Sequence, residues 1–251
     1  MDKKYRNYIG GEWADNEGGT LDVLNPATDK RIASVPDSKA ADVDRAVAAA
    51  KAAQPAWEKL PAIQRANHLR QISAKIRANA ERLAKTIVVE QGKVPELAAV
   101  EVEFTASYID YMAEWARRIE GEIVTSDRPG EQILVYRKPI GVIAGILPWN
   151  FPFFLIARKL GPALVTGNTI VIKPSEETPI NAFDFAELVA ETDLPKGVFN
   201  LVCGGRETGS TLTGHKDVGM VSFTGSVETG SRIMQACGKN LTRVNLELGG
   251  A

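Results

Sequence analysis

The second half of the chain alternates short apolar runs, rich in β-branched residues, with segments of helical composition. A strand buried on both faces has such a continuous apolar run, and a helix between consecutive strands lets them pair in parallel. The pattern therefore predicts an α/β fold with a doubly wound parallel sheet. The expected strands are Gly141–Leu147, Thr169–Lys173, Val198–Val202, Gly219–Phe223 and Arg243–Leu248, and the expected helices are Pro152–Val165, Pro179–Glu191, Glu207–Gly214 and Ser226–Gly238.

The first 140 residues contain longer helical stretches and fewer strands. Apolar residues at helical spacing, such as Leu69, Ile72 and Ile76, indicate amphipathic helices in this part of the chain. The expected elements are a short strand at Tyr8–Trp13, a loop ending near Pro36, helices at Ser38–Gln54, Pro61–Val89 and Pro95–Trp115, the last ended by Gly121, and paired strands at Ile123–Val124 and Gln132–Arg137.

A run without charged residues lies between Lys138 and Arg158, close to the length that crosses a bilayer. Pro139, Pro148 and Pro152 interrupt the run, so no single helix extends through it. We expect a buried strand, a loop and the start of a helix, and no membrane partner.

Composition and charge are those of an ordinary globular chain, with 44% apolar and 24% charged residues and a net charge of -1. Near-neutrality gives no electrostatic reason to bind nucleic acid or an anionic membrane. Two cysteines cannot form a disulfide framework, and no apolar secretory segment follows the start Met1–Tyr5. These features predict a cytoplasmic location. His68 and His215 lack neighbours at ligand spacing, so no metal site is expected.

Doubly wound sheets bind ligands beyond the carboxyl ends of their strands, and two pairs of residues lie at such ends. Lys173 can donate to ribose hydroxyls or a phosphate, and Glu176 can accept ribose hydroxyl protons; the alternative is a solvated rim. Gly225 and Ser226 lie between a strand and a helix, where backbone N–H groups and the positive helix end favour a phosphate. The alternative there is a plain N-cap turn.

Two other polar residues at strand ends are candidates for catalysis. Asn150 follows Trp149, and its amide can donate to an oxyanion, although a turn-forming Asn is the commoner case. Glu247 lies in Leu246–Gly250, where we expect apolar neighbours and glycines that let a ligand approach closely. Its carboxylate can act as a general base; the alternative is an ordinary surface glutamate.

Taken in order along the chain, four motifs resemble those of the aldehyde dehydrogenase superfamily. They are Ile146–Pro152, Lys173–Glu176, Phe223–Ser226 and Leu246–Gly250. The resemblance covers the chain from the loop Asn25–Thr28 onward, and about the first half of a complete family member. Within the superfamily, Tyr108–Trp115 and Phe151–Arg158 are most similar to NAD-dependent lactaldehyde and glycolaldehyde dehydrogenases.

The resemblance implies oxidation of an aldehyde to a carboxylic acid with NAD as cofactor. Asn150 would donate to the oxyanion of a thiohemiacetal, and Glu247 would activate the water that hydrolyses a thioester. Glu176 would favour NAD over NADP. The implied cofactor-binding residues are Ile146, Leu147, Pro148, Trp149, Lys173, Glu176, Gly225, Ser226 and Leu248.

The resemblance also implies a domain organisation and partners. Residues 1–120 would supply the amino-terminal strand and helices of the cofactor domain, residues 121–140 a β-hairpin oligomerisation arm, and residues 141–251 the NAD-binding αβ core. The implied partners are a small aldehyde and further copies of the full-length chain.

One part of the family pattern does not occur in this sequence. The family's nucleophile is a cysteine in a G-Q-x-C-type motif after the E-L-G-G motif, whereas this sequence stops at Ala251. Cys203 and Cys237 are expected to be inert packing residues. We therefore expect an amino-terminal part of an enzyme that is inactive alone, and an end inside a family motif favours this interpretation. The alternative is a non-catalytic module that binds NAD or docks on full-length subunits.

Substrate choice has one candidate, Arg158, the first charge on the helix that opens at Pro152. Phe154 lies four residues earlier on the same face. If this face borders the aldehyde's entry path, the guanidinium can donate to the hydroxyl of a short hydroxyaldehyde such as lactaldehyde or glycolaldehyde. The alternative is a salt bridge to a neighbouring domain. Lys159 points roughly 100° away around the helix, so we do not expect it to substitute.

Overall fold

The computed structural model, which describes residues 3–249, has a seven-stranded sheet at its centre. Five neighbouring strands pair in parallel, and an antiparallel hairpin extends the sheet at one edge. From edge to edge the strands are β11 (Arg243–Leu248), β10 (Met220–Gly225), β7 (Val142–Ile146), β8 (Thr169–Lys173), β9 (Phe199–Leu201), β1 (Asn7–Ile9) and β2 (Glu12–Ala14). The predicted doubly wound sheet is confirmed. Gly250, the last residue of one motif, lies outside the described residues.

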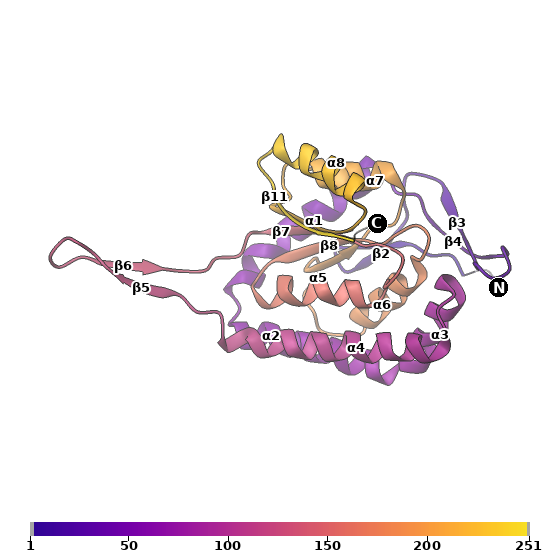
Figure 1. Ribbon diagram of the computed structural model, residues 1–251, viewed down its shortest axis with the longest axis horizontal. Helices are drawn as coiled ribbons and strands as arrows, with labels where there is room; N and C mark the ends of the chain where they lie inside the picture. Colours follow the sequence, from indigo (N-terminus) through magenta and orange to yellow (C-terminus); the bar gives the residue numbers. More distant parts are fainter. Residues whose placement is uncertain (1–2, 250–251) are drawn as a thin grey trace.

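Helices cover both faces of the sheet (Figure 1). One face carries α1 (Ala40–Lys59), α7 (Arg206–Gly214) and α8 (Val227–Gly238), and the other carries α5 (Phe154–Val165) and α6 (Ile180–Ala190). Outside α5 and α6 lies a further layer, α2 (Ala62–Ala78), α3 (Ala80–Gln91) and α4 (Pro95–Glu114), and a short 3-10 helix, Trp115–Arg117, follows α4. The main apolar core is continuous from this outer layer to the sheet, so the first 120 residues and the αβ core fold as one body.

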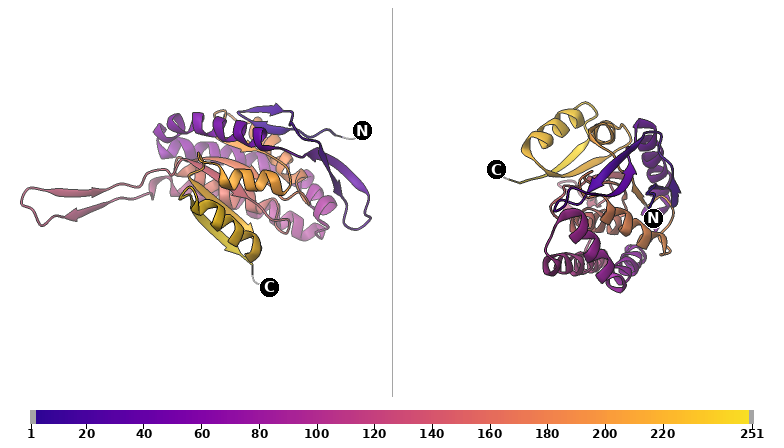
Figure 2. Two further views of the ribbon diagram at one scale, coloured as in Figure 1. Left: turned by 90° about the horizontal axis from the view of Figure 1, so that it is seen from above. Right: turned by 90° about the vertical axis from the view of Figure 1, so that its right-hand side faces the viewer.

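A two-stranded hairpin projects from this body (Figures 1 and 2). Its strands are β5 (Glu122–Thr125) and β6 (Gln132–Val135), and every residue in them is exposed. Ile123 is 78% exposed although it is a large apolar residue. The paired strands expected here are confirmed, and they form a sheet of their own that is not hydrogen-bonded to the described strands of the main sheet.

The amino-terminal segment contains more strand than expected. The single strand expected at Tyr8–Trp13 is wrong: Gly10 and Gly11 both have positive φ, 62° and 83°, and reverse the chain between β1 and β2. The loop expected before Pro36 is also wrong, because β3 (Thr20–Leu24) and β4 (Arg31–Pro36) form a second hairpin there.

Two helices differ from their expected extents. The helix expected to stop near Gln54 continues through Pro55 to Lys59, because Trp57 is buried and its Nε1 donates to Leu164 O at 3.1 Å. The stretch expected as one helix from Pro61 divides at Asn79, whose backbone leaves the helical region with φ -119° and ψ 17°. Tertiary contacts and one local backbone change, rather than helix propensity, set these boundaries.

The uncharged run between Lys138 and Arg158 divides as expected into strand, loop and helix. It contains β7 and the first turn of α5. Within residues 3–249, no helix is both long and apolar enough to cross a membrane.

A buried glutamate on α3 stabilises the start of α6. Glu90 is 2% exposed, and its carboxylate accepts N–H groups from Ile180 at 2.7 Å and from Asn181 at 2.8 Å. Burial raises the pKa of Glu90 from 4.5 to about 8, although the hydrogen bonds from Asn181 and Ile180 oppose the shift.

The raised pKa of Glu90 predicts a pH-dependent stability. The folded chain binds more protons than the unfolded chain between about pH 5 and about pH 8, so the free energy of unfolding falls as pH rises through this window. We expect Glu90→Gln to reduce this decline, measured by thermal melting across the window. Glu81→Gln, on the exposed side of the same helix, is the control and should leave the decline intact. Identical pH profiles for all three proteins would contradict the prediction.

Candidate functional site

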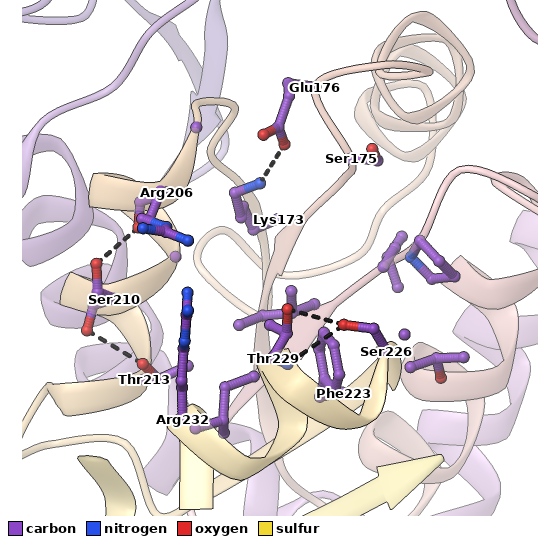
Figure 3. Close-up of a pocket in the computed structure, with 18 of the residues that line it drawn as sticks. Lys173, Ser175, Glu176, Arg206, Ser210, Thr213, Phe223, Ser226, Thr229 and Arg232 are labelled. Atoms are coloured by element: carbon purple, nitrogen blue, oxygen red, sulfur yellow. Dashed lines mark hydrogen bonds and ion pairs between the residues drawn. The ribbon is translucent and has the colours of Figure 1, made fainter. Parts of the chain in front are cut away.

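A cavity of about 750 Å³ opens at the carboxyl ends of β7, β8 and β10 (Figure 3). These ends meet because Ile146 lies opposite Lys173 on one side and opposite Phe223 on the other. Helices α7 and α8 form the remaining wall. The volume is in the range of sites that enclose small ligands and cofactors. Of the residues proposed from the sequence, the cavity is lined by Ile146, Leu147, Pro148, Trp149, Lys173, Glu176, Gly225 and Ser226.

Lys173 and Glu176 form a polar pair at the cavity wall (Figure 3). The Lys173 side chain is 7% exposed, and its Nζ donates to Glu176 Oε2 at 3.1 Å and to Pro174 O at 3.0 Å. A lysine this buried is not part of a solvated rim. The pair offers a cation and a carboxylate at one place, which suits neighbouring hydroxyl groups.

Gly225 and Ser226 lie where β10 passes into α8. Ser226 is the N-cap of α8, and its Oγ accepts the Thr229 N–H at 3.2 Å. Glycine is required at 225 because an added Cβ would lie 2.4 Å from the Phe223 ring. The N-cap alternative is thus correct for the serine hydroxyl. Ser226 and Thr229 at this helix start line the cavity, and the first turn of an α-helix has N–H groups without partners inside the helix.

Two arginines that the sequence did not single out also line the cavity. Arg206 on α7 and Arg232 on α8 point toward the space between these helices (Figure 3). Arg232 pairs with Glu228, whereas Arg206 has no ion-pair partner among residues 3–249. Arg206 places a positive charge at this end of the cavity, and both guanidinium groups suit an anionic or π-rich ligand. No spacing in the sequence indicates them, since only the packing of α7 beside α8 brings them together.

Lys159 is a third residue that the sequence did not propose. It is 4% exposed, and its Nζ donates to Ser222 Oγ at 3.1 Å and to Thr224 Oγ1 at 2.9 Å. Burial lowers the pKa of Lys159 to about 8. Its side chain passes over Gly145, where an added Cβ would lie 3.5 Å from Lys159 Cδ. The expected direction, away from Arg158, agrees with these contacts.

Asn150 lies exposed in the turn between β7 and α5. Its Oδ1 accepts the Phe151 N–H at 3.0 Å, which fixes the orientation of the amide. Among the described residues no acceptor is recorded for Nδ2, so this N–H group is free to donate to a ligand. The turn-forming and donor interpretations are therefore compatible, because they use different atoms of one side chain.

Glu247 and Arg158 form an ion pair. Arg158 Nη2 donates to both carboxylate oxygens of Glu247, at 3.1 and 3.0 Å; the side chain of Arg158 is 41% exposed and that of Glu247 is 37% exposed. The surroundings of Glu247 are thus not only apolar, because a guanidinium on α5 contacts its carboxylate. The salt bridge of Arg158 forms within this body rather than to a neighbouring domain.

Phe154 packs into the protein. It is 9% exposed and stacks on Phe104 of α4 with ring centroids 4.5 Å apart. Leu248 is not among the cavity-lining residues; its side chain packs against Gly230 of α8, where an added Cβ would lie 2.6 Å from Leu248 Cδ2.

The two thiols are buried away from the cavity lining. Burial raises the pKa of Cys203 to about 12 and also raises the pKa of Cys237. A thiolate is the reactive form of cysteine, so both residues are poor nucleophiles.

Comparisons with known proteins agree with this geometry. The chain is 60% identical over 245 residues to lactaldehyde dehydrogenase of Escherichia coli (strain K12), covering 97% of this chain and 51% of that protein. A solved structure of lactaldehyde dehydrogenase superimposes with a TM-score of 0.98 at 57% identity, over 100% of this chain and 53% of the other. The crystal structure of PnpE in complex with nicotinamide adenine dinucleotide superimposes with a TM-score of 0.96 at 44% identity, over 99% of this chain and 51% of the other.

The chain spans about half the length of the curated relatives that it matches. Residues 13–251, nearly the whole chain, match the aldehyde dehydrogenase family. The sheet order, the cavity at the strand ends and this match lead to one conclusion: the chain belongs to the aldehyde dehydrogenase family.

Proposed function

We propose that this chain supplies the cofactor site, an oxyanion donor and a general base of an NAD-dependent aldehyde dehydrogenase. The observation that carries the proposal is the cavity at the strand ends, which joins the Lys173–Glu176 pair, the helix start at Ser226 and the turn before Asn150. The identity to lactaldehyde dehydrogenase and the likeness to an NAD-bound dehydrogenase support it.

The residues present fit a dinucleotide. Glu176 and Lys173 suit ribose hydroxyls, the start of α8 suits a pyrophosphate, and Arg206 and Arg232 suit the adenine end. Gly225 keeps the strand end open, since a side chain there would collide with Phe223. Bound NAD supplies a hydride acceptor. The carboxylate of Glu176 would repel the 2′-phosphate of NADP.

In this proposal the amide of Asn150 donates from Nδ2 to the aldehyde oxygen as negative charge develops on it. Such donors act strongly because they are oriented before the reaction begins. Once Glu247 is released from Arg158, its carboxylate takes a proton from the water that hydrolyses the thioester. The ion pair is partly exposed, and such pairs contribute about 0–1 kcal/mol, so exchanging partners costs little. Neither Cys203 nor Cys237 supplies the nucleophile, because both are buried.

A short hydroxyaldehyde such as lactaldehyde or glycolaldehyde is the proposed substrate. The Arg158 guanidinium would donate to the substrate hydroxyl or to the product carboxylate, while Phe154 shapes the adjoining wall of α5 and α4.

The projecting hairpin is proposed as an oligomerisation arm, with residues 1–120 and 141–251 forming the cofactor domain. Its exposed apolar residues, such as Ile123 and Leu134, need a covering surface, and a second copy of the full-length chain supplies one. Both cysteines are free, which agrees with the proposed cytoplasmic location.

The first test is turnover. We expect the full-length protein to oxidise lactaldehyde or glycolaldehyde with NAD, measured by NADH absorbance, and residues 1–251 expressed alone to show none, because both thiols are buried. Turnover by residues 1–251 that survives Cys203→Ala plus Cys237→Ala would contradict the covalent mechanism. NAD binding without turnover in the full-length protein would favour the non-catalytic module instead.

The second test concerns Glu176. Calorimetric titration should show tighter binding of NAD than of NADP, and Glu176→Gln should narrow the ratio of the two dissociation constants by about tenfold, because it removes like-charge repulsion. Glu177→Gln changes the same charge one residue away and outside the cavity lining, so it should leave the ratio unchanged. An unchanged ratio in Glu176→Gln would remove this residue from the ribose site.

The third test concerns Arg158. In the full-length protein, Arg158→Leu should raise KM for lactaldehyde by about 10- to 100-fold and leave KM for propanal nearly unchanged, because propanal has no hydroxyl to accept the lost hydrogen bond. Its effect on kcat should be similar for both aldehydes, since Glu247 loses the same partner. Arg158→Lys keeps the charge and serves as the control. If both KM values rise alike, Arg158 has a structural role.

A further inference from the structure

A buried ion pair lies beneath the turn that carries Asn150. Lys93, between α3 and α4, is 8% exposed at its side chain, and Glu101 of α4 is 0% exposed. Their charged groups are in direct contact. A buried charge pair is a weak device for stability, because well-packed apolar residues of the same volume do as well or better. The other contacts of the two charged groups are therefore a better indication of their role.

Glu101 binds the end of the turn. Its Oε1 accepts the backbone N–H groups of Phe153 at 2.9 Å and of Phe154 at 3.1 Å. These are the first N–H groups of α5, which has no side-chain N-cap of its own. The carboxylate thus caps the helix from outside and fixes where the turn must end.

Lys93 binds the start of the same turn. Its Nζ donates to the carbonyl oxygen of Asn150 at 3.0 Å and lies 3.8 Å from the centroid of the Phe151 ring. Gln91 Nε2 reaches the same carbonyl at 3.5 Å, a longer and weaker contact. One ammonium therefore holds both residues that border the peptide bond 150–151.

This peptide sets the direction of the Asn150 amide. Asn150 Oδ1 accepts the Phe151 N–H at 3.0 Å, so a rotation of the peptide carries the side chain with it. A displacement of about 1 Å in a group that contacts the reacting atoms can reduce the rate about 100-fold.

We propose that Lys93 is a positioning residue for aldehyde oxidation: anchored by Glu101, it fixes the Asn150 peptide so that Nδ2 points at the developing oxyanion. The inference rests on the proposed function of Asn150. Lys93 does not line the cavity, and its effect on the rate would pass through Asn150.

A double-mutant cycle in the full-length enzyme tests the proposal. Lys93→Met should lower kcat by about 10- to 100-fold and leave the dissociation constant for NAD within about twofold. In an Asn150→Ala background the same substitution should cause no further loss of kcat, because both changes act through one group. Lys75→Met, which removes an exposed ion pair on α2, is the control and should change neither quantity.

A second variant distinguishes a loss of positioning from a failure to fold. Lys93→Met leaves the Glu101 charge buried without a partner, whereas Lys93→Met plus Glu101→Gln removes both charges and keeps an oxygen to accept the N–H groups of Phe153 and Phe154. This folded variant should retain the kcat loss. Normal kcat in it, or an equal loss in the native and Asn150→Ala backgrounds, would overturn the proposal.

A crystal structure of the charge-free variant gives a readout independent of turnover. We expect the Asn150 amide to move by about 1 Å while α5 stays in place. An unmoved turn overturns the role of Lys93 and leaves the proposed function intact. Normal kcat in Asn150→Ala overturns the oxyanion assignment and the role of Lys93 with it, and full-length protein without turnover contradicts the proposed function itself.

Discussion

Capping of two helices by buried carboxylates is the constraint on which the site depends. The helices α5 and α6 follow the strands β7 and β8, whose ends form the cavity, and neither helix has a side-chain cap of its own. Glu101 and Glu90, from the outer helical layer, accept the first N–H groups of α5 and α6 respectively. Buried N–H groups without partners are costly, so the outer layer and the site form a single structural unit. Through the two glutamates, α3 and α4 contact the helix starts that lie beside the cavity.

Charges around the cavity fall into two groups with different surroundings. Lys159 is buried and bonded to hydroxyl groups, and burial lowers its pKa to about 8. Arg158, the next residue along α5 toward the amino terminus, is partly exposed and pairs with Glu247. Adjacent positions on one helix thus place one cation against β10 and the other beside Glu247 of β11. The first is held by its surroundings, and the second can exchange partners.

Much of the fold could be predicted because the spacing of apolar residues along the chain indicates which positions are buried. The bounds of β8 and β11 agree with the sequence pattern residue for residue, and three of the four motifs contribute residues to one cavity at the strand ends, whereas Leu246, Glu247 and Leu248 do not line it. Pairings that depend on distant segments could not be predicted: the Arg158–Glu247 ion pair spans 89 positions, and Glu90 reaches α6 across 90. Local spacing carries no signal for such contacts, since they arise only when the tertiary fold brings distant segments of the chain together. The same reason explains why Arg206 and Lys93 were not proposed.

The hairpin of β5 and β6 has a consequence for assembly. Each strand has four residues, and both faces are exposed. An isolated two-stranded ribbon of this size is marginally stable in water, so its order depends on whatever surface covers it. In the proposed assembly, ordering of the arm and encounter between subunits would form one coupled equilibrium, in which protomer concentration enters directly. Dilution of the protomer should therefore disorder the arm while the sheet and its cavity persist. Assembly then depends on protomer concentration, whereas ligand binding depends on ligand concentration.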